Sequence, residues 1–442
     1  ILLFFASAFL SLHGWAAGID DEAAIHDEGD EITEAHDKQQ KESEQTKTRG
    51  FPLIQPFVIQ SQDGASSLRL SSGAQLRIIF AGYEDEAGLR DRESELTFGR
   101  LRASILAHFF EKRLSFHGQL NLVPGFLELI DLSLSYRFHP SLVLSAGQLK
   151  IPYSLSRAQS YSTLPLVNWG QTPRWFGGER QIGLAVGNAP GAFDGFLYRV
   201  GVFHGQNSRA SFSNRLARVY GEELPNPSLL TESVGYGVVH PEFAARLGYG
   251  AKDFDWWMLR DELRGPLRSF FSVSSAYDLR PIETNDATLR LAVEFLSKWK
   301  GFGFSAQYHW AWVTLSEQTA GASTPLGYHG LQAEVVYSLH PRIDLALRYG
   351  LTQISEKIRK DAQRRADAII ADAPADERES LTLHYAKSGR VIQDEELSAG
   401  VNIYLLGRLL EWQSDISYLP VKLEGERSSR ETRVRTQFQV QF

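Results

Sequence analysis

The 442-residue chain contains no cysteine. It therefore has no disulfide framework, no thiolate ligand for a metal and no cysteine nucleophile. The absence of thiols fits an oxidising compartment, where a free thiol is reactive. The chain also lacks a P-loop, because GFGF at 301–304 has no Lys-Ser/Thr pair after it. We expect no metal centre and no cofactor.

An excess of positive charge is missing as well. The formal net charge is −7, which gives no electrostatic basis for a nucleic-acid partner. The histidines that share a strand face with polar residues show no triad spacing; they are His108, His117, His204 and His309. We therefore do not expect an enzyme.

Long apolar runs are confined to the N-terminus. Residues 1–17 are apolar and then reach small residues, which is typical of a secretory signal peptide. The run is shorter than the ~20 residues of a membrane-spanning helix. Residues 18–60 follow as a leader, in which 19–50 carries eleven acids against four bases. Such a segment buries too little to fold as a globular unit, so we expect disorder or a short helix in the periplasm.

What the chain has in abundance is two-faced strands. Between 302 and 312, for example, Phe, Tyr and Trp alternate with Gly, Ser, Gln and His. This period of two indicates strands with one apolar and one polar face. Sixteen such strands are expected, at 68–80, 94–110, 113–123, 127–138, 142–149, 180–188, 194–204, 242–250, 269–277, 287–297, 301–313, 327–338, 343–352, 394–405, 409–418 and 431–442.

The strands favour a transmembrane β-barrel over a soluble β-sandwich. Many have ten or more residues, the length that a tilted strand needs to cross a bilayer. Tyr and Trp lie near the ends of the apolar faces, at Tyr136, Tyr337, Tyr349, Trp299, Trp312 and Trp412. The connections alternate between short and long, as in outer-membrane barrels with short periplasmic turns and long external loops. The 251–268 link is the exception, and it indicates either a misplaced strand or a turn with a short helix.

Closure of the barrel explains why the chain ends in an ordered strand. In hydrocarbon every backbone donor and acceptor is paired within the protein, so the last strand must pair with the first. In RETRVRTQFQVQF, Val434, Phe438, Val440 and Phe442 are expected to face lipid. Residues 61–442 are thus predicted to form an antiparallel barrel of about 16 strands in the bacterial outer membrane.

The polar face of the strands, formed by the residues that alternate with the apolar ones, is rich in arginine. It is expected to line a water-filled lumen. The predicted pore-lining arginines are Arg69, Arg77, Arg100, Arg102, Arg113, Arg137, Arg199, Arg246, Arg290, Arg348, Arg433 and Arg435. Acids on this face are fewer: Asp131, Glu294, Glu334, Asp344, Glu411 and Asp415. Basic pore rings favour anions. The alternative is that these arginines pair with the acids or extend to the rims of the barrel.

The third external link, 150–179, is predicted to fold inward and narrow the channel. It is long, contains three prolines and is rich in hydroxyls and aromatics. Its predicted anion-binding residues are Lys150, Tyr153, Arg157, Arg174 and Arg180. The arginine fork matches oxyanions such as phosphate. A loop that only packs against its neighbours is the alternative.

A second long link, 354–393, has helical spacing and mixed charge. Apolar residues recur at Ile358, Ala362, Ala366 and Ile369, which is the spacing of one helix face. We expect a short external helix.

Two stretches resemble the phosphate-selective porin O and P family. GQLKIPYSL at 147–155 is similar to its segment leading into the constriction loop, and FGRLRASILAHFFEKRLSFHGQLNL at 98–122 to its arginine-rich hairpin. The resemblance implies a trimeric, sixteen-stranded outer-membrane porin that passes phosphate or related anions. By the same likeness, Phe442 resembles the terminal aromatic that barrel-assembly machinery recognises.

Two other functions stay open at this point. A general or sugar-type porin would share the fold without anion selectivity, although a sugar porin would show an aromatic path with few arginines. A structural or adhesive barrel would use its long loops to bind partners.

Overall fold

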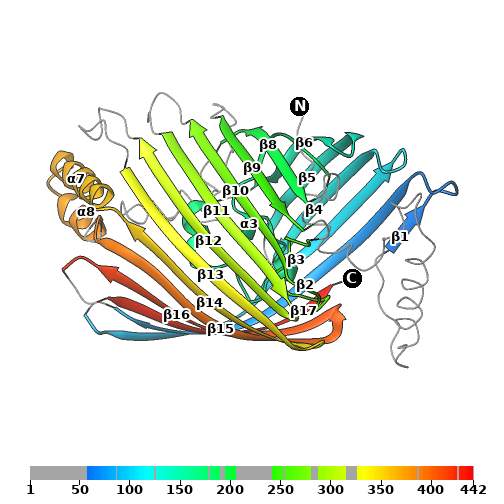
Figure 1. The fold of residues 1–442 in the computed structure, drawn as a ribbon. Coiled ribbons are helices and arrows are strands. Elements are labelled where there is room, and N and C mark those ends of the chain that lie inside the picture. Colours follow the sequence, from blue (N-terminus) through cyan, green and yellow to red (C-terminus); the bar gives the residue numbers. More distant parts are fainter. Residues whose placement is uncertain are drawn as a thin grey trace.

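The computed structural model describes residues 57–85, 87–123, 126–177, 180–189, 195–205, 241–251, 254–279, 287–314, 326–385, 388–425 and 428–441. The predicted signal peptide, most of the leader and Phe442 lie outside these residues. In the described part the chain forms one closed barrel of tilted strands (Figure 1).

Sixteen antiparallel strands make the barrel wall, and each pairs with its neighbours in sequence. They are β2 (Ser67–Glu84), β3 (Arg90–Phe109), β4 (Leu114–Val123), β5 (Phe126–His139), β6 (Leu142–Lys150), β7 (Arg180–Gly187), β8 (Phe196–Phe203), β9 (Glu242–Gly250), β10 (Arg268–Leu279), β11 (Ala287–Trp299), β12 (Phe302–Thr314), β13 (Leu326–His340), β14 (Ile343–Ile354), β15 (Val391–Arg408), β16 (Leu410–Leu423) and β17 (Ser429–Gln441). The predicted fold class is confirmed, and all sixteen expected strands are present.

The last strand closes the barrel against the first. β17 pairs with β2 from Gln441 opposite Gly73 to Arg430 opposite Glu84. A short strand, β1 (Phe57–Gln60), pairs with the start of β2, beyond the end of β17. β1 lies inside the segment predicted as a leader, so the ordered sheet begins before residue 61.

Two pairs of strands are longer than the sequence indicates. β2 and β3 pair as far as Glu84 and Arg90, and β16 and β17 as far as Val421 and Ser429. The expected links 81–93 and 419–430 are therefore shorter in the structure. The start of β3 is charged and exposed on both faces. Its composition resembles that of a loop, although its backbone is paired.

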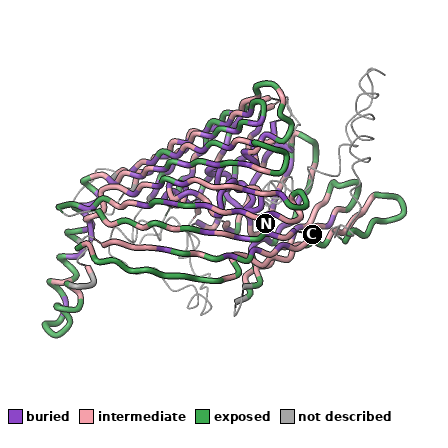
Figure 2. The backbone as a smooth tube through the Cα atoms, turned by 90° about the horizontal axis from the view of Figure 1, so that it is seen from below, coloured by how far each residue is buried: buried purple, intermediate pink, exposed green. Residues whose placement is uncertain are grey.

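The two faces of the strands differ as the alternation predicts. On β17, Val434 and Phe438 are 41% and 49% exposed, whereas Arg435, Gln437 and Gln439 are buried. Buried and exposed residues alternate along the strands in Figure 2. Outside the barrel such a surface is compatible with hydrocarbon rather than with water.

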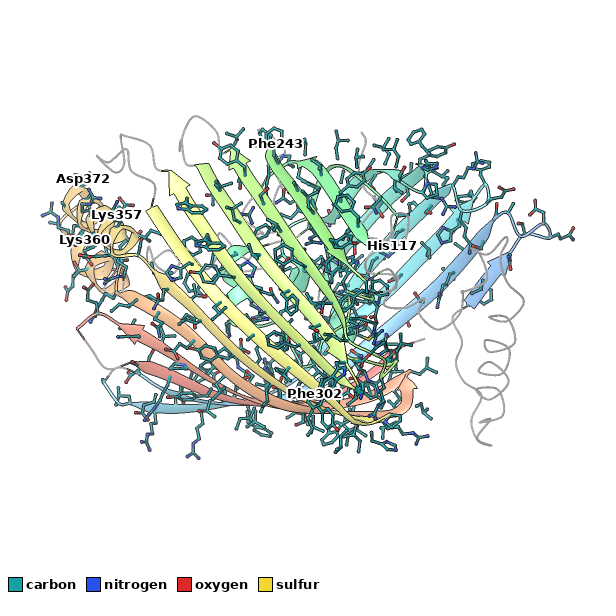
Figure 3. The ribbon with its side chains drawn as sticks, in the orientation of Figure 1. His117, Phe243, Phe302, Lys357, Lys360 and Asp372 are labelled. Atoms are coloured by element: carbon teal, nitrogen blue, oxygen red, sulfur yellow. The ribbon has the colours of Figure 1, made fainter. Side chains whose placement is uncertain are left out.

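Exposed aromatic residues gather near the strand ends. Phe138, Tyr249, Trp299 and Phe302 lie at one end of the barrel, and Phe243 lies towards the other end of β9. Phe302 and Phe243 are at opposite ends of the barrel in Figure 3. Aromatic residues at both rims are typical of the two membrane interfaces of such a barrel. Among the described residues, no helix is long and apolar enough to cross a membrane.

The barrel has a short-turn end and a long-loop end. Links at the short-turn end include 110–113, 140–141 and 341–342. At the long-loop end, α7 (Glu356–Asp372) and α8 (Arg378–His384) follow β14. The Ser355 side chain accepts from the Ile358 N–H and caps α7. Ile358 belongs to the apolar face that α7 buries, so the predicted helix is present.

The 251–267 link differs from both sequence expectations. It joins β9 to β10 at the short-turn end, and its residues 254–267 contain neither a strand nor a helix. Phe254 and Trp256 are buried among side chains of β8, β10 and β11, inside the barrel. The physical reason is the apolar run FDWWML, which is excluded from water when the link turns inward.

Candidate functional site

The segment 151–177 lies against the inner wall of the barrel. It contains α3 (Leu155–Ala158), the 3₁₀ turn η1 (Tyr161–Thr163) and α4 (Gln171–Phe176). Three backbone N–H groups of the segment donate to wall carboxylates: Leu155 to Glu294 (2.5 Å), Val167 to Asp415 (2.9 Å) and Gln171 to Glu396 (2.5 Å). The acids of the inner wall therefore hold the segment by its main chain.

The carbonyl groups of the same segment are held by wall donors. These contacts run from Arg77 to Val167 O (3.2 Å), Arg290 to Phe176 O (2.8 Å), Arg348 to Asn168 O (3.0 Å), Asn402 to Pro165 O (3.0 Å) and Gln413 to Leu164 O (2.9 Å). An irregular segment has no regular ladder of its own, so its buried backbone groups need such partners. Much of the lumen polarity serves this purpose.

The arginines predicted to line the pore divide into two groups. Those beneath the inner segments are buried: Arg77, Arg199, Arg246, Arg290, Arg348 and Arg435. Three of them form ion pairs on the wall, Arg290 with Glu242, Arg348 with Glu334 and Arg435 with Asp415. A buried, paired guanidinium contributes little to the field in the lumen, because its charge is neutralised locally.

The second group is exposed or half-buried, and comprises Arg69, Arg100, Arg102, Arg113, Arg137 and Arg433. Arg113 lies in the turn before β4, and Arg137 donates to the Glu111 carbonyl at the short-turn end (3.2 Å). Arg433 is paired with Glu431 (2.5 Å). Arg100 and Arg102 of β3, in contrast, point at the inner segment.

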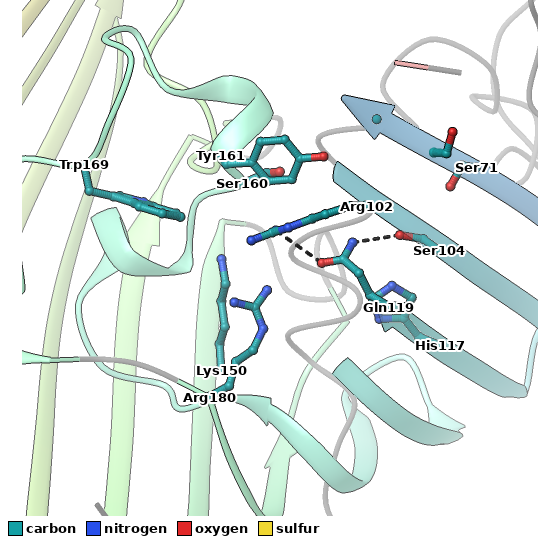
Figure 4. Close-up of a pocket in the computed structure, with 12 residues that line it drawn as sticks. Ser71, Arg102, Ser104, His117, Gln119, Lys150, Ser160, Tyr161, Trp169 and Arg180 are labelled. Carbon is teal, nitrogen blue, oxygen red and sulfur yellow. Dashed lines mark hydrogen bonds between the residues drawn. The ribbon is translucent and has the colours of Figure 1, made fainter. Parts of the chain in front are cut away.

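Arg102 belongs to a pocket, hereafter the basic pocket, between the β2–β7 wall and the inner segment (Figure 4). The pocket encloses about 540 Å³, part of it open to solvent. It is lined by Ser71, Ser72, Gly73, Arg102, Ser104, His117, Gln119, Lys150, Ser160, Tyr161, Trp169 and Arg180. Among these lining residues are the guanidiniums of Arg102 and Arg180, the Lys150 amine and no carboxylate.

Two acids behind the lining, Asp131 and Glu128, compensate part of this charge. Asp131 accepts from both Nε (2.8 Å) and Nη2 (3.0 Å) of Arg180. Such a bidentate pair also fixes the guanidinium plane. Lys150 Nζ donates to the carbonyls of Ala158 (3.0 Å) and Gln159 (2.8 Å). The basic groups that line the pocket therefore outnumber the two acids behind it, Asp131 and Glu128.

Gln119 positions Arg102 in the pocket. Arg102 Nη1 donates to Gln119 Oε1 (3.3 Å), while the Gln119 amide donates to Ser104 Oγ (2.8 Å). These neutral partners orient the guanidinium without forming an ion pair with it.

Two aromatic rings of the inner segment lie over these cations. The Arg102 guanidinium is 4.4 Å from the Tyr161 ring centroid, and Arg100 and Arg157 are 4.9 and 4.7 Å from that of Trp169. Cation–π contacts of this kind hold arginine side chains without neutralising them. Burial raises the pKa of the Tyr161 phenol, which therefore keeps its proton at neutral pH.

The structure brings together three of the five predicted loop residues. Lys150 and Arg180 line the basic pocket, and Arg157 contacts Trp169 beside it. Tyr153 is elsewhere, fully buried with its hydroxyl donating to Leu291 O on β11 (3.4 Å). Arg174 lies on α4, which packs on β12–β15, so these two residues are not part of the pocket.

Several residues of the pocket were not predicted from the sequence to belong to a site. His117, Gln119 and Ser104 share strand faces with inner residues, so alternation places them inside without saying that they meet. Tyr161 and Trp169 lie on an irregular segment, where no periodicity indicates direction. Their proximity to arginine depends on how the segment folds, which alternation along strands does not encode.

The comparisons with known proteins agree on the fold. No family model matches the chain, and no curated protein matches it. The anion-selective porin from Comamonas acidovorans is structurally similar, with a TM-score of 0.55, 11% identity, 85% of this chain and 100% of that chain covered. The outer-membrane channel DcaP of Acinetobacter baumannii has a TM-score of 0.54, 10% identity and coverages of 87% and 99%. OprB of Pseudomonas putida has a TM-score of 0.54, 11% identity and coverages of 85% and 94%.

These similarities, with the closed sixteen-stranded wall and its apolar outer surface, show a porin-like barrel of the bacterial outer membrane.

Proposed function

We propose that the protein is a porin that lets small anions, phosphate or related oxyanions among them, diffuse passively across the outer membrane. The observation that carries the proposal is the basic pocket, where Arg102, Lys150 and Arg180 meet and outnumber the acids behind them, Asp131 and Glu128. Net positive charge between low-dielectric walls raises the local concentration of anions.

The distribution of the inner segments supports a path along the β2–β7 wall. On the opposite side, Phe254 and Trp256 meet Leu155 and Ala158 in one apolar cluster with wall residues. Leu166 and Leu259 pack similarly on β13 and β14. Because this side is occupied, solutes would pass beside Arg100 and Arg102 rather than beside the buried ion pairs.

The chemistry of the basic pocket favours oxyanions over larger neutral solutes. Arginine presents two parallel N–H groups that match two oxygens of a phosphate. Ser71, Ser104 and Ser160 add hydroxyl donors around the same space. A neutral sugar would gain nothing from the cations, so a sugar-type porin fits this lining less well.

The resemblance of 147–155 and 98–122 to the phosphate-selective porin O and P family supports the same solute class. The residues that carry it include Gly147, Gln148 and Lys150, and Lys150 lines the basic pocket. That family also implies a homotrimer, which we include in the proposal. Cross-linking of the detergent-extracted protein would test it.

The proposed channel is tested in planar bilayers. Under a KCl gradient we expect a reversal potential that corresponds to chloride selectivity, and addition of phosphate should reduce the chloride current. Cation selectivity would contradict the anion proposal. Anion selectivity without any effect of phosphate would limit the protein to a general anion porin, and absence of channels would favour a structural or adhesive barrel.

A further inference from the structure

Two buried arginines stand opposite each other on neighbouring strands. Arg199 of β8 is in register with Arg246 of β9, so the two side chains leave the sheet on the same inward face. They are 3% and 1% exposed. Within the described part of the chain, none of the six guanidinium nitrogens of this pair has a hydrogen-bond partner.

Other buried arginines of the inner wall are bonded to acids or carbonyls. Arg290 pairs with Glu242, Arg348 with Glu334, and Arg435 with Asp415. The lack of partners is therefore a property of the Arg199–Arg246 pair and not of the wall in general.

The charges around the pair do not balance. The charge that acts on Arg199 is that of Arg246, which repels it, and Glu294 is the acid that acts on Arg246. The Glu294 oxygens accept from the Leu155 N–H and the Ser272 hydroxyl, so they serve the inner segment. Two guanidiniums against one carboxylate leave one positive charge. An unpaired charge in such surroundings is strongly unfavourable.

We propose that Arg199 and Arg246 together bind one small monovalent inorganic anion of the size of chloride, held as a resident counter-ion. The single negative charge of this anion neutralises the remaining positive charge, and the anion accepts hydrogen bonds from N–H groups of both guanidiniums. The burial of both side chains, 3% and 1% exposed, leaves little room at the guanidiniums and favours a monatomic ion over phosphate. Neither arginine lines the basic pocket, so this site is distinct from the proposed conduction path.

The site would also stabilise the inner segment. Ser274 is in register with Arg246, and its hydroxyl accepts from the Ser154 N–H (3.2 Å), directly before α3. Phe254 and Trp256 pack below α3 from the short-turn end. Loss of the anion would restore repulsion beneath the place where the two inward links meet.

Anomalous diffraction on the unmodified full-length protein tests the site directly. Crystals are grown in NaBr, and data are collected at the bromine edge. The expected result is a bromide peak within hydrogen-bond distance of both the Arg199 and Arg246 guanidiniums. Absence of a peak there, with ordered guanidiniums, would overturn the proposal.

Thermal stability gives an independent test. The temperature at which the heat-modifiable gel band is lost is measured while chloride replaces gluconate, a larger anion, at constant ionic strength. For the wild type, the midpoint should rise with chloride, because a ligand bound only by the folded state stabilises it. In the variant Arg199→Met/Arg246→Met the chloride dependence should disappear, whereas Arg113→Met, in an exposed turn, should retain it. An equal chloride dependence in the wild type and the double variant would refute the site.

Discussion

Replacement of Arg102 tests the basic pocket most directly. In Arg102→Gln the pocket loses one of its three cations, while Gln119, Ser104 and the Tyr161 ring that surround the guanidinium are unchanged. We expect weaker binding of phosphate and lower selectivity for chloride, because the remaining cations are Lys150 and Arg180, and Arg180 is paired with Asp131.

The size of the effect follows from Coulomb's law. Two unit charges about 4 Å apart interact with about 1 kcal/mol in bulk water and about 4 kcal/mol near a protein surface. A wet pocket that is part open to solvent belongs towards the lower end, so we take about 1–2 kcal/mol. Since 1.4 kcal/mol is a factor of ten, the phosphate concentration for half-maximal block should rise about 5- to 30-fold.

Planar-bilayer recording of single channels is the assay, with two companion variants. Arg102→Lys keeps the positive charge but loses the two parallel N–H donors of the guanidinium. It should therefore preserve chloride selectivity and weaken the block by phosphate. Arg433→Gln is the matched control, because Arg433 is already paired with Glu431 and lies away from the pocket. Equal losses in Arg102→Gln and Arg433→Gln would refute a local basic pocket and point to a diffuse effect of net charge.

Three further predictions concern the surroundings of the pocket. Asp131→Asn should release Arg180 from its bidentate partner and shift the reversal potential further towards chloride; an unchanged potential would mean that Arg180 does not face the path. Phe254→Ala/Trp256→Ala should increase single-channel conductance in the same bilayers, because these rings fix the 254–267 link inside the barrel; unchanged conductance with a folded gel band would contradict this. Burial acts to raise the pKa of Glu262, but Arg408 and Arg260 hold this pKa below its usual range. The contribution of Glu262 to stability is therefore present above the ordinary carboxyl pKa, and it is lost as the pH falls through the lowered pKa of the folded state. Protonation of Glu262 should thus loosen the 254–267 link inside the barrel. Conductance measured in an acidification series should rise at low pH in the wild type, and the rise should be smaller in Glu262→Gln, which lacks the titrating carboxyl.

The barrel itself was predictable because the side-chain period of a strand is short-ranged. The alternation around Val434 and Phe438 shows which residues face lipid and which face the lumen, and it does so without information on the neighbouring strands. The strand ends were less predictable. Residues 90–95 (RDRESE) are as polar as a loop, and only their pairing with β2 makes them a strand.

The inner contacts were not predictable, because they join residues that are distant in sequence. Lys150 and Arg180 flank the same link, so their proximity follows from the hairpin formed by β6 and β7. Trp169 meets Arg100 only because the segment crosses the lumen, and Phe254 meets Leu155 only because two links from opposite ends turn inward. Each case depends on the path of an irregular backbone.

The same contacts explain why counting charges along one face overstates the field in the lumen. The count of twelve arginines against six acids treats each side chain as free in water. In the structure, Glu294, Asp415 and Glu396 accept main-chain N–H groups, while Arg290 and Arg348 donate to main-chain carbonyls. A barrel wall that holds an irregular segment inside it needs donors and acceptors of both kinds, since that backbone has no other partners. The positive charge of the lumen is then decided by which arginines are left without an acid or a main-chain carbonyl as partner, and on the described wall Arg102, held by Gln119 and the Tyr161 ring, is one of them.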